Sequence, residues 1–258
     1  MQDLTAFLVV STMLALPRVA SAEGFLVEWS VAADSFASSS LGGASVGCSA
    51  PAKRPRSGSA VFLKLEEEKA RRDEETVSYI LRKDLNLLYV LFHGSNQYSE
   101  LHLPLKQRKI DSSFKKSMGE LGSEYHRLRL EGEIQQIDEK VGSWPVTLFG
   151  GTVANQLGRR LEVRIGYSKK LESLPAIGEE LELLIQKLRF EGDDWITLVS
   201  SSTHVPAIWE ENLQLPEVQV RYREQITSVT ETIFADVDFE VPEDYREVPY
   251  DPYCVLKW

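Results

Sequence analysis

The feature that most constrains the fold is an alternation of apolar and polar side chains that repeats in many short segments. In residues 160–167, Leu161, Val163 and Ile165 are apolar, and the residues between them are polar or glycine. Successive side chains of a β-strand point to opposite faces, so each such segment predicts a strand with one apolar face. The sequence predicts further strands in 25–31, 60–65, 77–82, 87–92, 97–103, 125–137, 144–153, 218–229 and 231–241.

One predicted hairpin, Tyr79–Leu105, shows how such a sheet is layered. Its strand 87–92 is apolar on both faces and precedes a polar turn at 94–96. The next strand alternates, with Leu101 and Leu103 on one side. We expect the first to be an interior strand of a curved sheet, covered on its concave side.

The period changes to a helical one in residues 175–188. Pro175 and two acids precede or begin a run with helical apolar spacing, formed by Ile177, Leu181, Leu184, Ile185 and Leu188. Residues 193–214 are ambiguous and are interpreted as a second helix. The fold predicted is mainly β (α+β): a curved antiparallel sheet, or incomplete β-barrel, with a helical insertion at 175–214 as a lid on the concave face.

The N-terminus has the pattern of a signal peptide. Residues 6–16 are apolar, and Pro17 and an A-x-A pattern ending at Ala22 follow, which predicts cleavage between Ala22 and Glu23. The segment before the apolar run carries Asp3 and no basic residue, so the start lies upstream or the signal is weak. A buried core helix is the alternative. We expect a periplasmic or secreted protein with one domain spanning 23–258.

A segment rich in Ser, Gly and Pro, residues 35–59, predicts a mobile loop or a lid. It contains Cys48; the other cysteine of the chain is Cys254. An exported chain with two cysteines allows a Cys48–Cys254 disulfide, and two unpaired thiols are the alternative.

The residues offer no catalytic, metal or cofactor motif. His93, His102, His126 and His204 lack metal-ligand spacing. Gly150-Gly151 is interpreted as a bulge, and the charge runs 66–68 and 71–75 as solvated faces. The net charge of −10 argues against nucleic acid as a partner, and no apolar run is long enough to span a membrane. We therefore expect no enzyme.

Several segments together resemble an uncharacterised family of exported bacterial proteins with the lipoprotein-localisation-factor half-barrel fold. They are RKDLNLLYVL followed by YSELHLP, EKAR at 68–71, VGSWPVTLF at 141–149, RLEVRIGYSKKL and DFEVPEDY at 238–245. The resemblance covers roughly residues 60–248, and its motifs are structural rather than chemical. It implies an incomplete barrel closed by helices over an apolar cavity, which in relatives of that fold holds acyl chains.

The apolar strand faces carry the remaining functional hypothesis. We expect the cavity to be lined by Leu128, Leu130, Val163, Ile165, Val218 and Val220. Such a cavity would bind a lipid or a lipoprotein acyl chain without any polar motif, since each buried methylene contributes about 0.8 kcal/mol. The alternative is a filled core in an envelope interaction module, which docks a protein through a sheet edge or its aromatic tail. That tail (Tyr245, Tyr250, Tyr253, Trp258) is either a stacking surface or a strap packed on the sheet.

Overall fold

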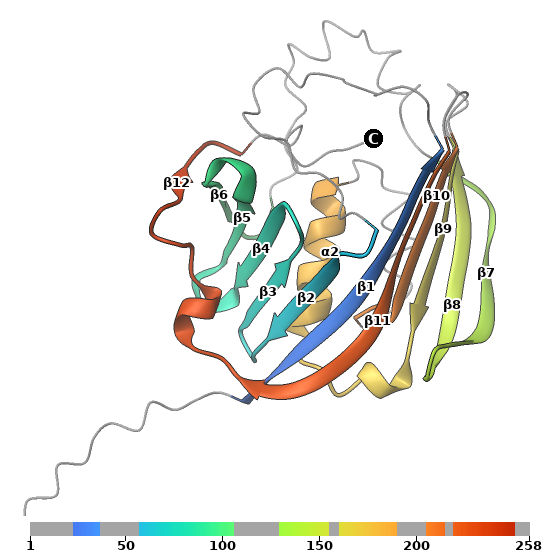
Figure 1. The fold of residues 1–258 in the computed structure, drawn as a ribbon, viewed down its shortest axis with the longest axis horizontal. Helices are drawn as coiled ribbons and strands as arrows, with labels where there is room; N and C mark the ends of the chain where they lie inside the picture. The colour runs from blue at the N-terminus through green and yellow to red at the C-terminus, as the bar shows by residue number, and fades with distance from the viewer. Residues whose placement is uncertain are drawn as a thin grey trace, which may run out of the picture.

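The protein folds as one curved sheet of 12 strands around an α-helix (Figure 1). The computed structural model describes residues 23–36, 57–105, 129–154, 160–189, 205–214 and 219–250. The spatial order is β12-β6-β5-β4-β3-β2-β1-β11-β10-β9-β8-β7. The strands are β1 (Glu23–Phe36), β2 (Ala60–Leu65), β3 (Lys69–Asp73), β4 (Val77–Arg82), β5 (Leu87–Phe92), β6 (Gln97–His102), β7 (Arg129–Val141), β8 (Trp144–Ala154), β9 (Arg160–Tyr167), β10 (Ile208–Gln214), β11 (Gln219–Ile233) and β12 (Arg246–Glu247). The predicted mainly-β architecture is confirmed.

The middle of the sheet is a long antiparallel pair that joins the N-terminal strand β1 to β11, near the end of the described chain. β1 pairs with β11 from Glu23↔Ile233 to Phe36↔Gln219, with a bulge next to Trp29. β2–β6 form one wall beside this pair, and β7–β10 form the other (Figure 1). All neighbouring strands are antiparallel except β12, which pairs parallel with β6. The two walls give the sheet its concave face.

The helix α2 (Ile177–Arg189) lies on the concave side of β2–β4. Glu179 and Glu180 occupy its first turn, where carboxylates interact favourably with the helix dipole. Gly178 lets the helix approach β2 closely, because a Cβ there would lie 3.0 Å from a methyl carbon of Leu65. Leu181 and Ile185 are fully buried. The helix predicted at 175–188 is confirmed.

Short turns connect the strands of the first wall. The 3₁₀ turns η1 (Lys83–Leu85) and η2 (His93–Ser95) are followed by Asn86 and Asn96, with φ of 57° and 47°. Asparagine tolerates this left-handed conformation better than most residues, because its side chain bonds locally. The predicted polar turn at 94–96 is therefore present. A third turn, η3 (Lys169–Leu171), follows β9.

Three sequence-based assignments differ from the structure. Residues 208–214 were interpreted as helix, but they form β10, paired along its length with β9 and β11. The strand predicted at 231–241 ends at Ile233, and the 3₁₀ turn η4 (Asp236–Phe239) follows. The strand β3 was not predicted, because its residues are mostly charged.

The C-terminal strap, residues 234–250, crosses the convex face of the first wall. Phe239 of η4 is completely buried against Ile80 and Leu91 and forms a second, smaller core there. Tyr245 packs against this core, and Tyr250 is buried in the main one. For these two tyrosines the strap interpretation of the aromatic tail is confirmed.

Some predictions concern residues outside the described ranges. These are the signal peptide 1–22, positions 37–56 of the predicted loop, both cysteines and the last two aromatic residues of the tail, Tyr253 and Trp258. The predicted loop begins too early, since Ser35 and Phe36 belong to β1. Among the described helices, none has the length and apolar character needed to cross a membrane.

Candidate functional site

The concave face of the second wall carries apolar side chains in rows across the strands. One row consists of directly paired residues on five neighbouring strands, Leu130, Val153, Leu161, Leu213 and Val220. A second row contains Phe149, Ile165 and Trp209. Residues directly opposite each other in an antiparallel sheet share a face. The alternation of β7–β11 therefore builds a mainly apolar face, which Glu211 interrupts between the two rows, where it pairs with Val163.

Four of the six predicted cavity residues lie on this surface. Leu130, Val163, Ile165 and Val220 share the concave face through their cross-strand pairing. Val163 and Ile165 are buried, and the other two are half-buried. Leu128 and Val218 lie outside the described residues. The structure brings the four together, and their role as a ligand lining remains a prediction.

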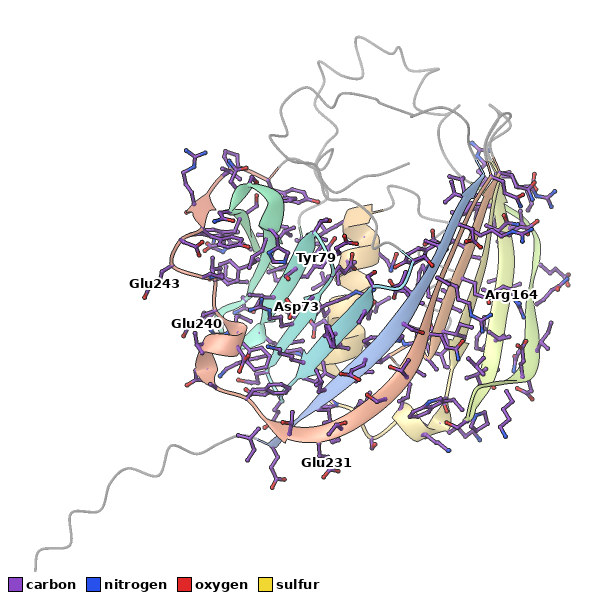
Figure 2. All side chains as sticks on the ribbon, viewed as in Figure 1. Asp73, Tyr79, Arg164, Glu231, Glu240 and Glu243 are labelled. Atoms are coloured by element: carbon purple, nitrogen blue, oxygen red, sulfur yellow. The ribbon has the colours of Figure 1, made fainter. Side chains whose placement is uncertain are left out.

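The two walls differ in what covers their concave sides. Under α2, the side chains of Leu63, Leu65 and Leu81 are fully buried and fill the space between helix and sheet. The main contacts of α2 are with β2–β4, yet Val153, Leu161 and Ile165 of the second wall are also fully buried. In that wall Phe149 is half-buried, with its ring centroid 6.1 Å from that of Tyr167. Figure 2 locates the two walls by one labelled residue each: Tyr79, on the face of the first wall toward α2, and Arg164, on the second wall.

A buried ion cluster lies in the concave interior. Arg72 on β3 is only 2% exposed, and its guanidinium donates to carboxylates from three elements. Nε lies 2.9 Å from Glu74, Nη1 lies 2.8 Å from Glu182 on α2, and Nη2 lies 2.6 Å from Glu224 on β11. The cluster thus joins the helix to β3 of the first wall and to β11 of the central pair.

Aromatic groups complete this cluster. Trp29 lies 5.6 Å from the guanidinium of Arg72, measured to the ring centroid. Tyr222 donates its hydroxyl hydrogen to Glu224, and Trp209 Nε1 donates to Glu211 at 2.7 Å. Such charge-assisted bonds satisfy buried groups that would otherwise be costly.

The electrostatics of the cluster fix its protonation. Burial alone would lower the pKa of Arg72, but the carboxylates of Glu182, Glu224 and Glu74 outweigh it and hold that pKa well above its ordinary value. Burial, followed by the charge of Glu224, raises the pKa of the Tyr222 hydroxyl well above its ordinary value. The arginine therefore stays charged and the tyrosine stays a donor.

This cluster contradicts the interpretation of residues 71–75 as a solvated charge run. Arg72 and Glu74 are buried, while Asp73 between them is half-buried and faces the other side. Residues 71–73 belong to the strand β3, whose two buried positions are Ala70 and the charged Arg72. The alternation Ala70, Arg72, Glu74 was the one signal that could have located it.

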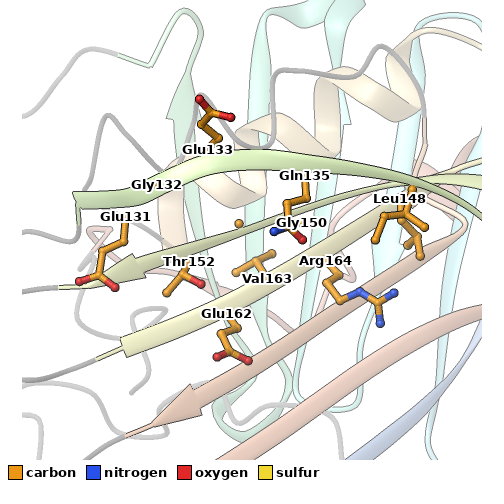
Figure 3. A pocket seen from close by; sticks show the side chains of 12 residues that line it. Glu131, Gly132, Glu133, Gln135, Leu148, Gly150, Thr152, Glu162, Val163 and Arg164 are labelled. Carbon is orange, nitrogen blue, oxygen red and sulfur yellow. The ribbon is translucent and has the colours of Figure 1, made fainter.

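A polar groove lies between β7 and β8 (Figure 3). Its volume is about 340 Å³, and it opens where the pairing of β7 with β8 shifts register between Glu131 and Gln135. Gly150 and Gly151 line it opposite this irregularity, but the extra residues lie in β7, so the bulge predicted at these two glycines lies on the neighbouring strand instead. Its walls include Glu133, Glu162 and Arg164. A groove with these polar walls does not suit an apolar chain.

The described histidines are not arranged as metal ligands. His102 is exposed, and His93 is half-buried among hydrogen-bonding partners on the convex face. The described part of the chain contains no group of three His, Cys, Asp or Glu side chains suited to a metal ion. His126 and His204 lie outside the described residues.

The pair Ser78 and His93 has the separation of a nucleophile and its base, 2.8 Å between Oγ and Nε2. Ser78 is fully buried, however, and donates its hydrogen to Asp73. A nucleophilic serine needs access to substrate and must give its proton to the base. The geometry therefore describes a structural hydrogen bond.

No protein-family model matches the chain, and no curated protein matches its sequence. The likeness to the half-barrel family therefore rests on the sequence segments quoted above.

Proposed function

We propose that this is an exported, non-enzymatic protein that binds an apolar ligand, a lipid or a lipoprotein acyl chain, on the concave side of its curved sheet. The observation that carries the proposal is the second wall, where aligned apolar and aromatic side chains of β8–β10 face the interior. The main contacts of α2 are with the first wall, and Phe149 and Leu130 of the second wall are only half-buried.

An apolar ligand needs no dedicated polar partner to bind there. Each methylene transferred from water contributes about 0.8 kcal/mol, so a chain of about ten carbons gains several kcal/mol from burial alone. Phe149 and Leu130 are half-buried members of the wall and are the described residues best suited to contact such a chain.

Native mass spectrometry of protein purified from the exported fraction tests the proposal, together with uptake of a fluorescent fatty acid. We expect co-purifying lipid and saturable uptake. Phe149→Asp places a charge on the apolar wall and should weaken uptake at least about tenfold. Thr152→Asp, on the opposite face of the same strand, is the matched control and should bind normally. Absence of both bound lipid and uptake in the native chain would refute the carrier function.

Export itself is tested by the mature N-terminus. We expect intact-mass analysis of the exported protein to begin at Glu23, the residue that starts β1. A chain that retains residues 1–22 and stays inside the cell would contradict this part of the proposal.

An envelope interaction module with a filled core is the second candidate. It is favoured by β7, an edge strand of 13 residues that is exposed along most of its length, with Ile137 51% exposed. Unpaired strand edges readily accept a further strand. Loss of a defined partner in Ile137→Lys, which places a charge on this edge strand, with fatty-acid uptake intact, would favour this candidate over the carrier.

A further inference from the structure

A continuous chain of hydrogen bonds joins the sheet to the C-terminal strap on the convex face. Ser78 Oγ on β4 lies 2.5 Å from Asp73 Oδ1 and 2.8 Å from His93 Nε2. His93 Nδ1 in turn lies 2.5 Å from the hydroxyl of Tyr245 in the strap. The chain thus runs from β3 through β4 and η2 to the strap.

The donors and acceptors of this chain fit a neutral imidazole. A carboxylate only accepts, so Ser78 donates its one hydrogen to Asp73. Ser78 Oγ then accepts from the Nε2–H of His93, which leaves Nδ1 as the acceptor for the hydroxyl of Tyr245. Every group in the chain has a partner when His93 carries no charge.

The strap also supplies part of the apolar surroundings of His93. The Tyr245 ring stands edge-on to the imidazole, with centroids 6.0 Å apart and an interplanar angle of 80°. Burial is the largest influence and lowers the pKa of His93, while Asp73 opposes this and Arg71 adds to it. Asp73 is itself paired with Arg71 at 2.7 Å, and this ion pair weakens the stabilisation that Asp73 could give to a protonated imidazole.

The end of the strap near His93 is also held by hydrogen bonds to β6 and η2, one of which runs from the Ser99 hydroxyl to the carbonyl of Val248 at 3.0 Å. The Arg246 N–H donates to the carbonyl of Asn96 at 2.9 Å, and the Val248 N–H donates to that of Tyr98 at 2.8 Å. Asp244 accepts from the Asn96 side chain at 2.9 Å.

The other end of the strap is anchored separately. Phe239 is buried there, and Lys64 pairs with Asp238 at 2.6 Å. Residues 244–248 thus lie between this anchor and the buried Tyr250, and they can separate from β6 while both anchors stay in place.

We propose that His93 is a pH-sensitive latch, and that its protonation in mildly acid solution releases residues 244–248 from β6. Release removes Tyr245 from the imidazole and lets water solvate the charge. It also uncovers part of the small core around Ile80 and Leu91 and the edge of β6.

The sign follows from linkage. In the docked state burial holds the pKa of His93 below its ordinary value of about 6.5, so a released form with a solvated imidazole would bind the proton more tightly. Docking is at full strength above that value and weakens as the pH falls below it, by up to tenfold for each unit of pKa difference. Lys64 holds the pKa of Asp238 below 3.8, so loss of that anchor belongs to stronger acid.

Amide hydrogen exchange followed by NMR tests this latch directly. The amides of Arg246 and Val248 report the strap, and the amide of Ile80 within β4 reports the sheet. With intrinsic exchange corrected, we expect protection of the two strap amides to fall between about pH 7.5 and about pH 5, while Ile80 stays protected. In His93→Gln, which donates and accepts hydrogen bonds but has no charge to gain, strap protection should not change over this range.

Two results would overturn the proposal. One is the same loss of strap protection in His93→Gln; the other is an equal loss at Ile80, which would mean general acid unfolding. If the strap of the variant is undocked even at neutral pH, the proposal is tested instead by the NMR titration of the His93 imidazole in the native chain. Its midpoint must coincide with the loss of strap protection, and a midpoint outside that range refutes the latch.

Discussion

Replacement of Arg72 by Met tests whether the buried cluster holds α2 to the sheet through charge. Methionine keeps much of the apolar volume of the arginine stem but removes the guanidinium that contacts Glu74, Glu182 and Glu224. Removing one partner of a buried ion pair costs about 3–5 kcal/mol, and here three carboxylates lose theirs. For a domain of this size each kcal/mol corresponds to about 2–4 °C, so the melting temperature should fall by roughly 6–20 °C.

The assay is thermal and urea unfolding followed by circular dichroism, at pH 7 and at about pH 5. In the variant three buried carboxylates lose the positive charge of Arg72, and protonation in acid would relieve the repulsion among them. Proton uptake by the folded state stabilises it, so the cost of Arg72→Met should be smaller at the lower pH. Arg164→Met is the matched control: Arg164 also bonds two glutamates, at 3.0 Å each, but its side chain is 45% exposed. Its loss should cost no more than about 1 kcal/mol.

A destabilisation by Arg72→Met of less than about 1 kcal/mol would contradict the reasoning, since that is the range of a surface pair. A cost that is the same at both pH values would also contradict it. The loss would then come from packing rather than from unpaired charge.

Three further outcomes are expected. Phe239→Ala should cost about 3–5 kcal/mol in urea unfolding because its ring is fully buried, whereas Val237→Ala, 67% exposed, should change stability by no more than about 0.5 kcal/mol. Gly166→Ala should cost about 1–3 kcal/mol, because a Cβ there would lie 2.4 Å from a side-chain carbon of β10, and Gly150→Ala, where the nearest atom is 3.5 Å away, should be tolerated. Asp238→Asn should reduce the loss of stability that the native protein shows below about pH 4. The reason is that Lys64 on β2 lowers the pKa of Asp238, so this ion pair stabilises the fold only above that range. The same loss of stability below about pH 4 in the variant would refute this assignment.

The strand walls could be predicted from sequence where local alternation and burial agree. The segment 160–167 is an example, because Leu161, Val163 and Ile165 all face the interior through their own periodicity. The helix at 177–189 was equally accessible, since its apolar spacing and acidic first turn are local signals.

The buried cluster could not be predicted in the same way. Arg72 is inward-facing only because Glu182 and Glu224 meet it, and these lie 110 and 152 residues further along the chain. A charged run offers no local sign of partners at such separations. Similarly, Trp209 and Leu213 in β10 alternate correctly, but the strand is identified by its pairing with β9 and β11 rather than by its composition.

The pairing of β1 with β11 has a consequence for the order of assembly. Glu23 meets Ile233 and Phe36 meets Gln219, so the central ladder joins segments separated by almost the entire chain. Each wall can form its own hairpins early, but the ladder that unites them requires a very large loop to close first. We expect the two walls to collapse before the central ladder forms, and the rate-limiting step to be their union through the first and eleventh strands. While β11 is still inside the ribosome, the edge of β1 that will pair with it is exposed. A chaperone that binds this edge would protect the unfinished chain best.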